Sequence, residues 1–362
     1  MKLIVKAVGN HCNIKCKGCF YFDNDQRTPT VMSNDILKQL LLVADARGEN
    51  HHVSWHGGEP LLAGIDFYRS VIDIQNKKSS STWKNSIQTN GILINKKWIE
   101  FFKENNFSVG ISINGTQKFH DDIRVTSSGK GTYGSVINSL KMLQDAGIRV
   151  GVICTVTKPM IHYGKEIFND MAGLGITSLS FNPMFNAIDD PLSIMGDDFS
   201  EFILDVYDEW INYTERKIRI REIYNVIHAA HDKKPPSCSF GNSCNKWLTI
   251  NYNGDIYPSC ERMTTRLSAI GNVKDIGDYT QVLCSPVISQ LNEKIQIKPP
   301  KCLGCPIENV CMNGCTDHQV NSDFEKSYGG NYIYCEARKA IYERVTSQIV
   351  ALKKPTTMSI NH

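Results

Sequence analysis

Short segments rich in β-branched and apolar residues alternate with longer amphipathic segments over roughly the first 215 residues. The short segments predict strands at 2–8, 51–55, 85–88, 107–112, 149–156 and 177–182. The longer segments carry an apolar stripe at helical spacing and predict helices at 35–46, 67–75, 96–105, 133–146, 163–173 and 199–213. Ser33 is placed to cap the first helix, and Gly147 and Gly175 follow helix ends, where left-handed residues are favoured. Six βα units predict an α/β fold whose parallel sheet forms a partial (β/α)6 TIM-type barrel.

Polar side chains follow several of the predicted strands. In barrels of parallel strands the chemistry lies in the loops after the carboxyl ends of the strands. A single Gly-Gly or Asn-Gly pair there is ordinary turn chemistry, but polar groups that converge at one barrel mouth predict a ligand pocket. Glu59 is placed to accept a hydrogen bond from an ammonium group. The segments concerned are 55–60, 88–91, 112–115 and 120–124.

Composition narrows the class of protein. The chain has 362 residues, of which 41% are hydrophobic and 21% charged, and its net charge of +3 is typical of a soluble globular protein. No arginine-rich run suggests a nucleic-acid partner. The sequence shows no signal peptide, and no apolar run approaches the ~20 residues of a membrane span. We therefore expect a cytoplasmic protein with no membrane or nucleic-acid partner, in which thirteen cysteines are more readily metal ligands than disulfides.

Three cysteines directly follow the first predicted strand. The segment HCNIKCKGCFY (residues 11–21) holds Cys12, Cys16 and Cys19 in a C-x3-C-x2-C spacing. Three thiolates can ligate three irons of a four-iron cluster and leave the fourth iron open. The alternatives are a zinc site, which usually has four ligands and paired spacings, and three unrelated buried cysteines. The asymmetric spacing favours the cluster.

A second group of cysteines lies beyond Lys233-Lys234-Pro235-Pro236, a stretch that interrupts the periodic pattern and indicates a domain boundary. Eight thiolates divide naturally into two fully ligated four-iron clusters, and two zinc sites are the alternative. An Asn-Gly turn at 253–254 predicts a hairpin that leads to Cys260 and Glu261. Cys154 and Cys284 lie apart from the clusters and are expected to be structural. The eight thiols are Cys238, Cys244, Cys260, Cys302, Cys305, Cys311, Cys315 and Cys335.

The three-cysteine loop, Gly57-Gly58-Glu59-Pro60 and the polar strand ends together resemble the radical S-adenosylmethionine (SAM) superfamily. That resemblance implies a [4Fe–4S] cluster whose open iron chelates SAM, and reductive cleavage to a 5′-deoxyadenosyl radical that abstracts hydrogen. It also implies which residues contact SAM: Gly57, Gly58 and Glu59 near its amino group, Gln88 and Ser112 along the third and fourth strands, and Arg124 at its carboxylate. The family usually has an aromatic residue before the third cysteine, beside adenine. Here that residue is Gly18, and Phe20 or Tyr21 is expected to supply the packing.

The eight later cysteines follow the order C-x5-C, C-x15-C and C-x2-C-x5-C-x3-C, which resembles the SPASM extension of radical SAM peptide maturases. The resemblance implies two auxiliary [4Fe–4S] clusters, and three clusters in all. Cys238, Cys244, Cys260 and Cys315 would hold the first auxiliary cluster, and Cys302, Cys305, Cys311 and Cys335 the second. We expect a radical SAM core at 1–225, a SPASM domain at 226–345 and a C-terminal tail at 346–362.

The strings WHGGEPLLAG (55–64) and SINGTQKFHDDIR (112–124) most resemble maturases that join an aromatic ring carbon to a side-chain Cβ in a ribosomally made peptide, forming a cyclophane. The alternative is an anaerobic sulfatase-maturing enzyme, which oxidises Cys or Ser to formylglycine; CFYF (19–22) and the eight-cysteine pattern fit it as well. Those relatives carry an Asp base where this chain has Glu261, which makes Glu261 the candidate base. Its alternative role is a salt bridge with Arg262 or Lys246. A non-catalytic scaffold that carries clusters is a further alternative, which the polar strand ends disfavour.

The resemblance also implies partners. A precursor peptide is the expected substrate, and flavodoxin or ferredoxin the expected low-potential electron donor. Because the first predicted strand begins at residue 2 or 3, there is no room before it for an N-terminal leader-binding domain. We therefore expect a leader to bind the barrel and SPASM surfaces, or a separate leader-binding protein.

Overall fold

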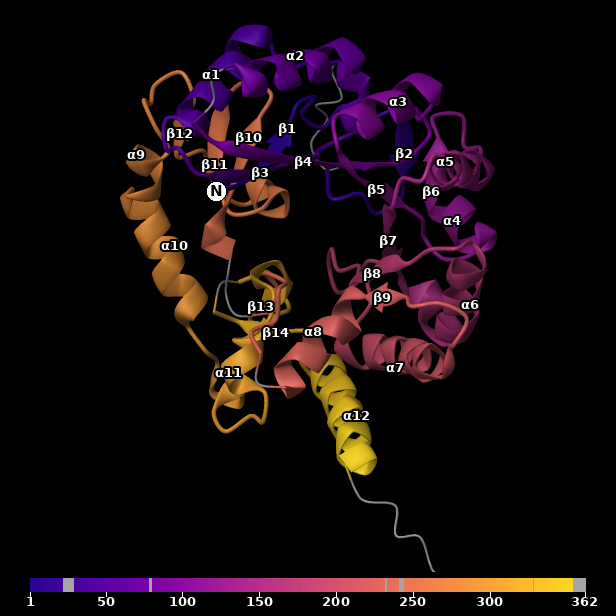
Figure 1. Ribbon diagram of the computed structural model, residues 1–362. Coiled ribbons are helices and arrows are strands. Elements are labelled where there is room, and N and C mark those ends of the chain that lie inside the picture. The colour runs from indigo at the N-terminus through magenta and orange to yellow at the C-terminus, as the bar shows by residue number, and fades with distance from the viewer. Residues whose placement is uncertain (22–28, 78–79, 232, 241–243, 328, 354–362) are drawn as a thin grey trace, which may run out of the picture.

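The computed structural model describes residues 1–21, 29–77, 80–231, 233–240, 244–327 and 329–353. Six consecutive neighbours in its main sheet are parallel strands, and helices form a layer around their outer face (Figure 1). These strands confirm the predicted α/β fold and its six βα strands. They are β1 (Lys2–Lys6), β3 (Asn50–Trp55), β4 (Thr82–Thr89), β5 (Ser108–Ser112), β7 (Val150–Val156) and β8 (Ser178–Pro183).

The helices between these strands also follow the sequence pattern. Ser33 caps the first of them by accepting a hydrogen bond from the Ile36 N–H at 3.3 Å, and Gly147 and Gly175 both have a φ of +76°. One short helix, α4 (Gln117–Ile123), was not predicted, because seven residues give too little periodicity to recognise. The other helices of this region are α1 (Asn34–Asp45), α2 (Ile65–Asn76), α3 (Lys96–Glu104), α5 (Tyr133–Asp145), α6 (Gly164–Gly173) and α7 (Gly196–Asn212).

Burial alternates along the parallel strands. In β7, Val150, Val152, Cys154 and Val156 are buried against the helices, whereas the residues between them are half-buried. Parallel strands covered on both faces usually read as continuous apolar runs. The alternation here shows that the inner face is only partly filled by protein side chains. Cys154 is a fully buried core residue, as expected.

The C-terminal region extends the barrel sheet, which the sequence pattern did not predict. β10 (Trp247–Asn251) pairs in parallel with the free edge of β1, and β11 (Asp255–Pro258) and β12 (Gly271–Asn272) continue outward as antiparallel strands. The predicted hairpin at 253–254 joins β10 to β11, with Gly254 at a φ of +90°. At the opposite edge β9 (Arg219–Ile220) pairs with β8. The expected boundary near residue 225 therefore separates segments that share one sheet.

The remaining elements surround the eight C-terminal cysteines. Helix α12 (Cys335–Lys353) packs on α7 and on α8 (Arg221–Ala230), so residues 346–353, expected to be a tail, are helical; residues 354–362 lie outside the described residues. The other elements are α9 (Thr280–Leu283), α10 (Pro286–Gln296), α11 (Glu308–Cys311), the β-pair β13 (Gln319–Val320) and β14 (Asn331–Tyr332), and the 3-10 helices η1 (Pro60–Ala63), η2 (Lys158–Tyr163), η3 (Cys244–Lys246), η4 (Glu261–Thr265), η5 (Pro300–Cys302) and η6 (Thr316–His318).

A last pair of strands, β2 (Ile14–Cys16) and β6 (Arg124–Thr126), lies apart from the main sheet. Their antiparallel register sets Cys16 opposite Arg124, which joins the three-cysteine loop to the segment after α4. No helix within the described part of the chain is both long enough and apolar enough to cross a membrane.

Candidate active site

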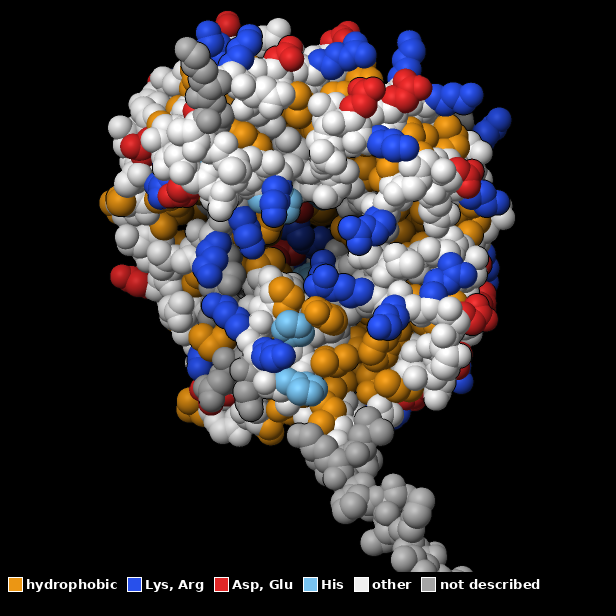
Figure 2. All heavy atoms as spheres, viewed as in Figure 1, with side chains coloured by type: hydrophobic (Ala, Val, Ile, Leu, Met, Phe, Trp, Pro, Cys, Tyr) orange, Lys and Arg blue, Asp and Glu red, His pale blue; other side chains and the backbone are white. Residues whose placement is uncertain are grey.

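One pocket gathers residues from the loops and carboxyl ends of the barrel strands. Figure 2 shows a hollow in the middle of this face, with Lys and Arg side chains gathered around it. The pocket brings together all three cysteines of the first loop and, from the C-terminal region, Glu261 and Arg262. Its further lining includes Tyr21, His56, Gly57, Gly58, Gln88, Thr89, Asn90, Ser112, Asn114, Arg124, Thr155 and Asn182.

The three-cysteine loop fits a cluster. Cys12, Cys16 and Cys19 all face the pocket. Two N–H donors approach the sulfurs: Asn90 Nδ2 lies 3.8 Å from Cys12 Sγ, and Arg124 Nη1 lies 3.8 Å from Cys16 Sγ. Burial raises the pKa of the Cys12 thiol to about 12, and a bound metal would favour its thiolate form.

The backbone conformation and the close packing at position 18 both favour glycine. Its φ is +69°, a conformation that side chains rarely adopt. A Cβ at this position would also lie 2.7 Å from the sulfur of Met184 and 3.3 Å from Leu192. The segment after β8 therefore fills the space beside Gly18.

The glycine pair after β3 allows two loops to pack backbone against backbone. Gly58 N donates to the carbonyl of Gly9 at 2.9 Å, and Glu59 N donates to that of His11 at 2.8 Å. A Cβ on Gly58 would lie 1.9 Å from the His11 carbonyl oxygen, and Gly57 has a φ of +110°. Both glycines therefore hold the second loop against the three-cysteine loop.

Glu59 is not among the residues that line the pocket, and its expected contact with an ammonium group stays a prediction. Its side chain is fully buried. The carboxylate accepts hydrogen bonds from Leu61 N at 3.0 Å, Thr89 Oγ1 at 2.7 Å and Asn90 N at 2.8 Å. Burial raises the pKa of Glu59 to about 7, although these donors oppose the rise. Through these hydrogen bonds Glu59 fixes the loop after β4, which includes Asn90.

Gln88, Ser112 and Arg124 lie in the pocket as the sequence suggested. Gln88 Nε2 donates to Ser112 Oγ at 3.2 Å, so neighbouring strands β4 and β5 present one polar surface. Arg124 Nε donates to Asn114 Oδ1 at 3.2 Å. Asn90 and Asn114 belonged to polar strand ends already noted but were not singled out. Because an Asn-Gly sequence is typical of an ordinary turn, it did not indicate that the Asn90 and Asn114 side chains point into the pocket.

Tyr21 and Phe20 follow the third cysteine and line the same pocket. Tyr21 is 7% exposed, and its hydroxyl has no hydrogen-bond partner among the described residues. The buried ammonium of Lys6 lies 4.4 Å from the centre of the Tyr21 ring, and the Arg262 guanidinium lies 4.8 Å from that of Phe20. These rings are available to pack on a ligand.

Glu261 begins η4, immediately after Cys260, and its side chain is 15% exposed towards the pocket. His56 Nε2 lies 3.9 Å from its carboxylate. Arg262 Nε donates to the buried carboxylate of Asp317 at 2.5 Å, and among the ion pairs of the described residues Glu261 pairs with neither Arg262 nor Lys246. Burial lowers the pKa of Lys6 to about 8, and the nearby Glu261 carboxylate partly offsets that effect.

Thiols within each expected set of the eight later cysteines shift one another's pKa, and the two ligand sets stay a prediction. Among the described residues, no group of three or more His, Cys, Asp or Glu side chains is arranged to hold a metal ion. Burial, then Glu261 and the thiols of Cys244, Cys315 and Cys238, raises the pKa of Cys260. The pKa of Cys302 is raised mainly by burial, and further by the nearby thiols of Cys311, Cys335 and Cys305.

Donors approach two of these sulfurs, one in each expected set. Thr316 Oγ1 lies 3.1 Å from Cys244 Sγ, and the Arg338 guanidinium lies 3.2 Å from Cys311 Sγ. Cys284 stands apart from both groups, exposed at the end of α9 and not buried as a core thiol.

Comparison with known proteins agrees with this geometry. The Radical SAM superfamily model matches residues 7–174, which contain the three-cysteine loop and strands β3 to β7. The matched residues make up just under half of the chain and resemble a radical SAM domain. That family implies a [4Fe–4S] cluster and SAM, and Cys12, Cys16 and Cys19 line the pocket in which such a cluster would lie.

Other proteins are similar to this chain over nearly its whole length. The cysteine-type anaerobic sulfatase-maturating enzyme of Clostridium novyi (strain NT) is 27% identical over 98% of this chain and 97% of its own. The serine-type enzyme of Bacteroides thetaiotaomicron is 25% identical over 97% of this chain and 91% of its own. The structure of anSMEcpe with bound AdoMet and Cp18Cys peptide has a TM-score of 0.88 at 22% identity, over 97% of this chain and 98% of that chain. It shows the same fold.

Proposed function

We propose that this protein is a radical SAM enzyme that oxidises a side chain of a peptide, with Glu261 as the proton acceptor. The observation that carries the proposal is that Glu261, from the C-terminal region, faces the same pocket as the three cysteines of the first loop. Both full-length relatives are sulfatase-maturating enzymes, and the similar solved structure holds a peptide. These similarities support a protein-derived peptide as the substrate that binds in the pocket.

We assign separate roles to the residues of the pocket: some surround SAM, and Glu261 accepts a proton. When bound, the cluster and SAM supply a carbon-centred radical that removes one hydrogen atom from the substrate. Gly57, Gly58, Gln88, Ser112 and Arg124 surround the space proposed for SAM, and Tyr21 offers a ring beside it. Glu261 accepts the proton that leaves as the substrate loses its second electron. Arg262 pairs with Asp317, and His56 Nε2 lies 3.9 Å from the Glu261 carboxylate.

The second electron needs an outlet, which two auxiliary [4Fe–4S] clusters would provide. Cys238, Cys244, Cys260 and Cys315 are proposed to hold one of them next to Glu261. Cys302, Cys305, Cys311 and Cys335 are proposed to hold the other. Four thiolates for each cluster leave no open iron, which favours electron transfer over substrate binding at these clusters.

The first candidate reaction is oxidation of Cys or Ser to formylglycine, because sulfatase-maturating relatives span nearly the whole chain. The side chain loses a hydrogen atom from Cβ to the radical, a proton to Glu261 and an electron to a cluster. Serine then carries its aldehyde directly. With cysteine, water replaces sulfur and hydrogen sulfide leaves.

The second candidate is a carbon–carbon crosslink between an aromatic ring carbon and a side-chain Cβ. Two features favour it: the resemblance of the strings at 55–64 and 112–124 to cyclophane-forming maturases, and Glu261 in place of the Asp of sulfatase-maturing enzymes. The same two hydrogens are lost, one as an atom and one as a proton, but no water enters. A flavodoxin or ferredoxin is proposed as the electron donor, and a separate leader-binding protein as a further partner.

The test is anaerobic turnover of reconstituted protein with SAM, dithionite and two peptide sets, read by high-resolution mass spectrometry. One set carries Cys or Ser in a sulfatase-type sequence, and the other consists of precursor peptides from neighbouring genes. An aldehyde in the first set supports formylglycine formation. Loss of two hydrogens without an aldehyde in the second set, with fragmentation that fails between two residues, supports the crosslink.

Variants test the proposed roles. Cys16→Ala should abolish SAM cleavage. Glu261→Gln should still cleave SAM to 5′-deoxyadenosine but lower product formation by about 10²–10⁴-fold, the usual contribution of a general base. Glu261→Asp, which keeps the carboxylate, is the matched control and should retain part of the activity. Unchanged product formation in Glu261→Gln would remove Glu261 from the mechanism.

A further inference from the structure

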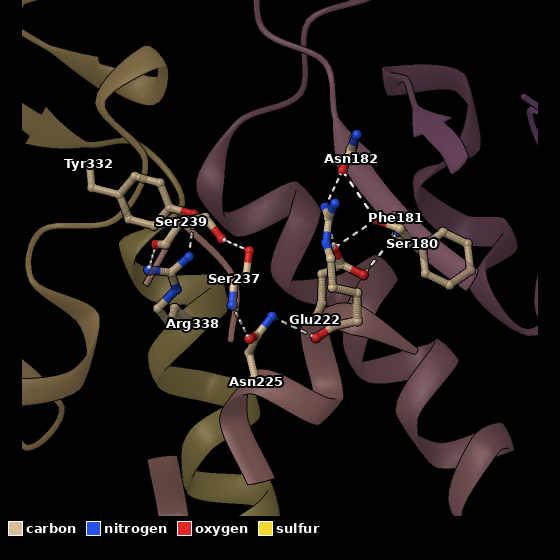
Figure 3. Close-up of polar contacts among 10 residues, drawn as sticks. Ser180, Phe181, Asn182, Glu222, Asn225, Ser237, Ser239, Tyr332 and Arg338 are labelled. Atoms are coloured by element: carbon tan, nitrogen blue, oxygen red, sulfur yellow. Dashed lines mark hydrogen bonds and ion pairs between the residues drawn. The ribbon is translucent and has the colours of Figure 1, made fainter. Parts of the chain in front are cut away.

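A buried arginine contacts one of the thiols proposed to hold the second auxiliary cluster. Arg338 lies in the first turns of α12, after Cys335, and is 8% exposed. One guanidinium nitrogen lies 2.9 Å from the carbonyl oxygen of Ser239 and 3.2 Å from Cys311 Sγ. The other donates to the Tyr332 hydroxyl at 3.0 Å. Figure 3 shows the guanidinium enclosed by Ser239 and Tyr332.

The surroundings hold this cation rigidly. The guanidinium lies 3.8 Å from the centre of the Phe240 ring and 4.6 Å from that of Tyr332. Figure 3 also shows that its partner Ser239 contacts Ser237, whose N–H donates to Asn225 of α8 at 3.1 Å. Arg338 therefore has a fixed position relative to both the barrel and the cysteines.

The charge of Arg338 is not balanced by a carboxylate. Among the described residues, no Asp or Glu oxygen lies within 4.0 Å of its guanidinium, whereas Arg262 has Asp317. A buried cation without a counter-charge costs several kcal/mol. The acidic group that it does contact is the thiol of Cys311. Iron-bound thiolates carry the negative charge that this site otherwise lacks.

We propose that Arg338 is the counter-charge of the second auxiliary cluster and raises its reduction potential. The inference rests on the proposed function, which assigns that cluster to Cys302, Cys305, Cys311 and Cys335. Reduction adds one electron and makes the cluster more negative. A buried cation that donates a hydrogen bond to a ligand sulfur stabilises the reduced state more than the oxidised state. Arg338 is thus a positioning residue that makes this cluster a better acceptor for the electron leaving the substrate.

The test measures iron content and the midpoint potentials of the full-length reconstituted protein, by potentiometric titration followed by electron paramagnetic resonance. Arg338→Met removes the charge and keeps an unbranched apolar chain, while Arg338→Lys keeps the charge. Arg344→Met is the matched control, since Arg344 lies on the same helix α12 and already pairs with Asp208 in a partly exposed position. We expect one of three midpoint potentials to fall in Arg338→Met, to fall less in Arg338→Lys, and to stay nearly constant in Arg344→Met.

Other outcomes are also decisive. Selective loss of the iron of one cluster in Arg338→Met, with retention in Arg338→Lys, would support the counter-charge. Full iron content with three unchanged potentials in Arg338→Met would overturn the inference, as would equal losses in the Met and Lys variants or an equal shift in Arg344→Met. Wild-type protein with iron for only two clusters would instead refute the second auxiliary cluster itself, and the role of Arg338 with it.

Discussion

Replacing Asp317 with asparagine should be among the most destabilising conservative changes in this chain. The carboxylate is 2% exposed and contacts three cations: Arg262 at 2.5 Å, Lys326 at 3.2 Å and Arg266 at 3.6 Å. Asparagine keeps the shape but removes the charge, and leaves the cations without their shared partner. Loss of one member of a buried ion pair typically costs about 3–5 kcal/mol.

The pKa of Asp317 gives a second measure of the same interaction. Burial alone would raise it, but Arg262, His318 and Lys326 outweigh burial and lower the pKa from 3.8 to about 2. A shift of this size corresponds to about 2 kcal/mol of stability at neutral pH. It is smaller than the cost of substitution, because protonation leaves the hydrogen-bonding groups in place, whereas asparagine directs an amide N–H at a cation.

The sign of the pH dependence follows from the lowered pKa. As the pH falls below about 5, the unfolded chain binds a proton at this position before the folded chain does, so the contribution to stability shrinks and is lost near pH 2. The wild type should therefore lose part of its advantage over Asp317→Asn as the pH is lowered.

Thermal unfolding under anaerobic conditions, followed by circular dichroism, checks these values. With an unfolding entropy of about 2.1 cal/mol/K per residue, 3–5 kcal/mol lowers the Tm by roughly 4–7 °C if the chain unfolds as one unit. Asp66→Asn is the control, since Asp66 is 89% exposed and pairs only with Arg69 on the surface. A shift in Asp317→Asn no larger than in that control, or one independent of pH between 5 and 3, would refute the reasoning.

Three further changes test the site. Gly58→Ala would place a methyl group 1.9 Å from the His11 carbonyl oxygen, so it should lower iron binding at the first loop several-fold, whereas Gly134→Ala, with open space around it, should leave iron content unchanged. Glu59→Gln leaves one buried backbone N–H facing an amide donor and should cost about 1–3 kcal/mol, seen as a lower Tm; no loss would mean that the loop rearranges. Lys6→Met should stabilise the protein at pH 7, because burial lowers the pKa of that ammonium to about 8, and urea titrations should show the gain narrowing between pH 8 and 10.5; a constant gain would contradict the lowered pKa.

The six barrel strands, most of the helices between them and the three thiols of the first pocket could be predicted from the sequence. These features depend on local signals: apolar periodicity, the Ser33 cap, and the C-x3-C-x2-C spacing of Cys12, Cys16 and Cys19 in the loop after β1. Such signals can be recognised in the sequence because they depend only on residues that are close together along the chain. The same reasoning located Gln88, Ser112 and Arg124 at strand ends, where the barrel topology brings them together.

Tertiary structure alone decided which groups face the pocket and which lie behind it. Glu59 belongs to a strand-end motif, yet three N–H and O–H donors from two loops draw it into the interior. Likewise β10 extends the sheet at the free edge of β1. Arg338 contacts Cys311, which lies 27 residues earlier in the chain, and no sequence periodicity links the two positions. Such contacts join residues far apart in the chain, and their partners are chosen by burial and charge compensation, which a one-dimensional pattern does not record.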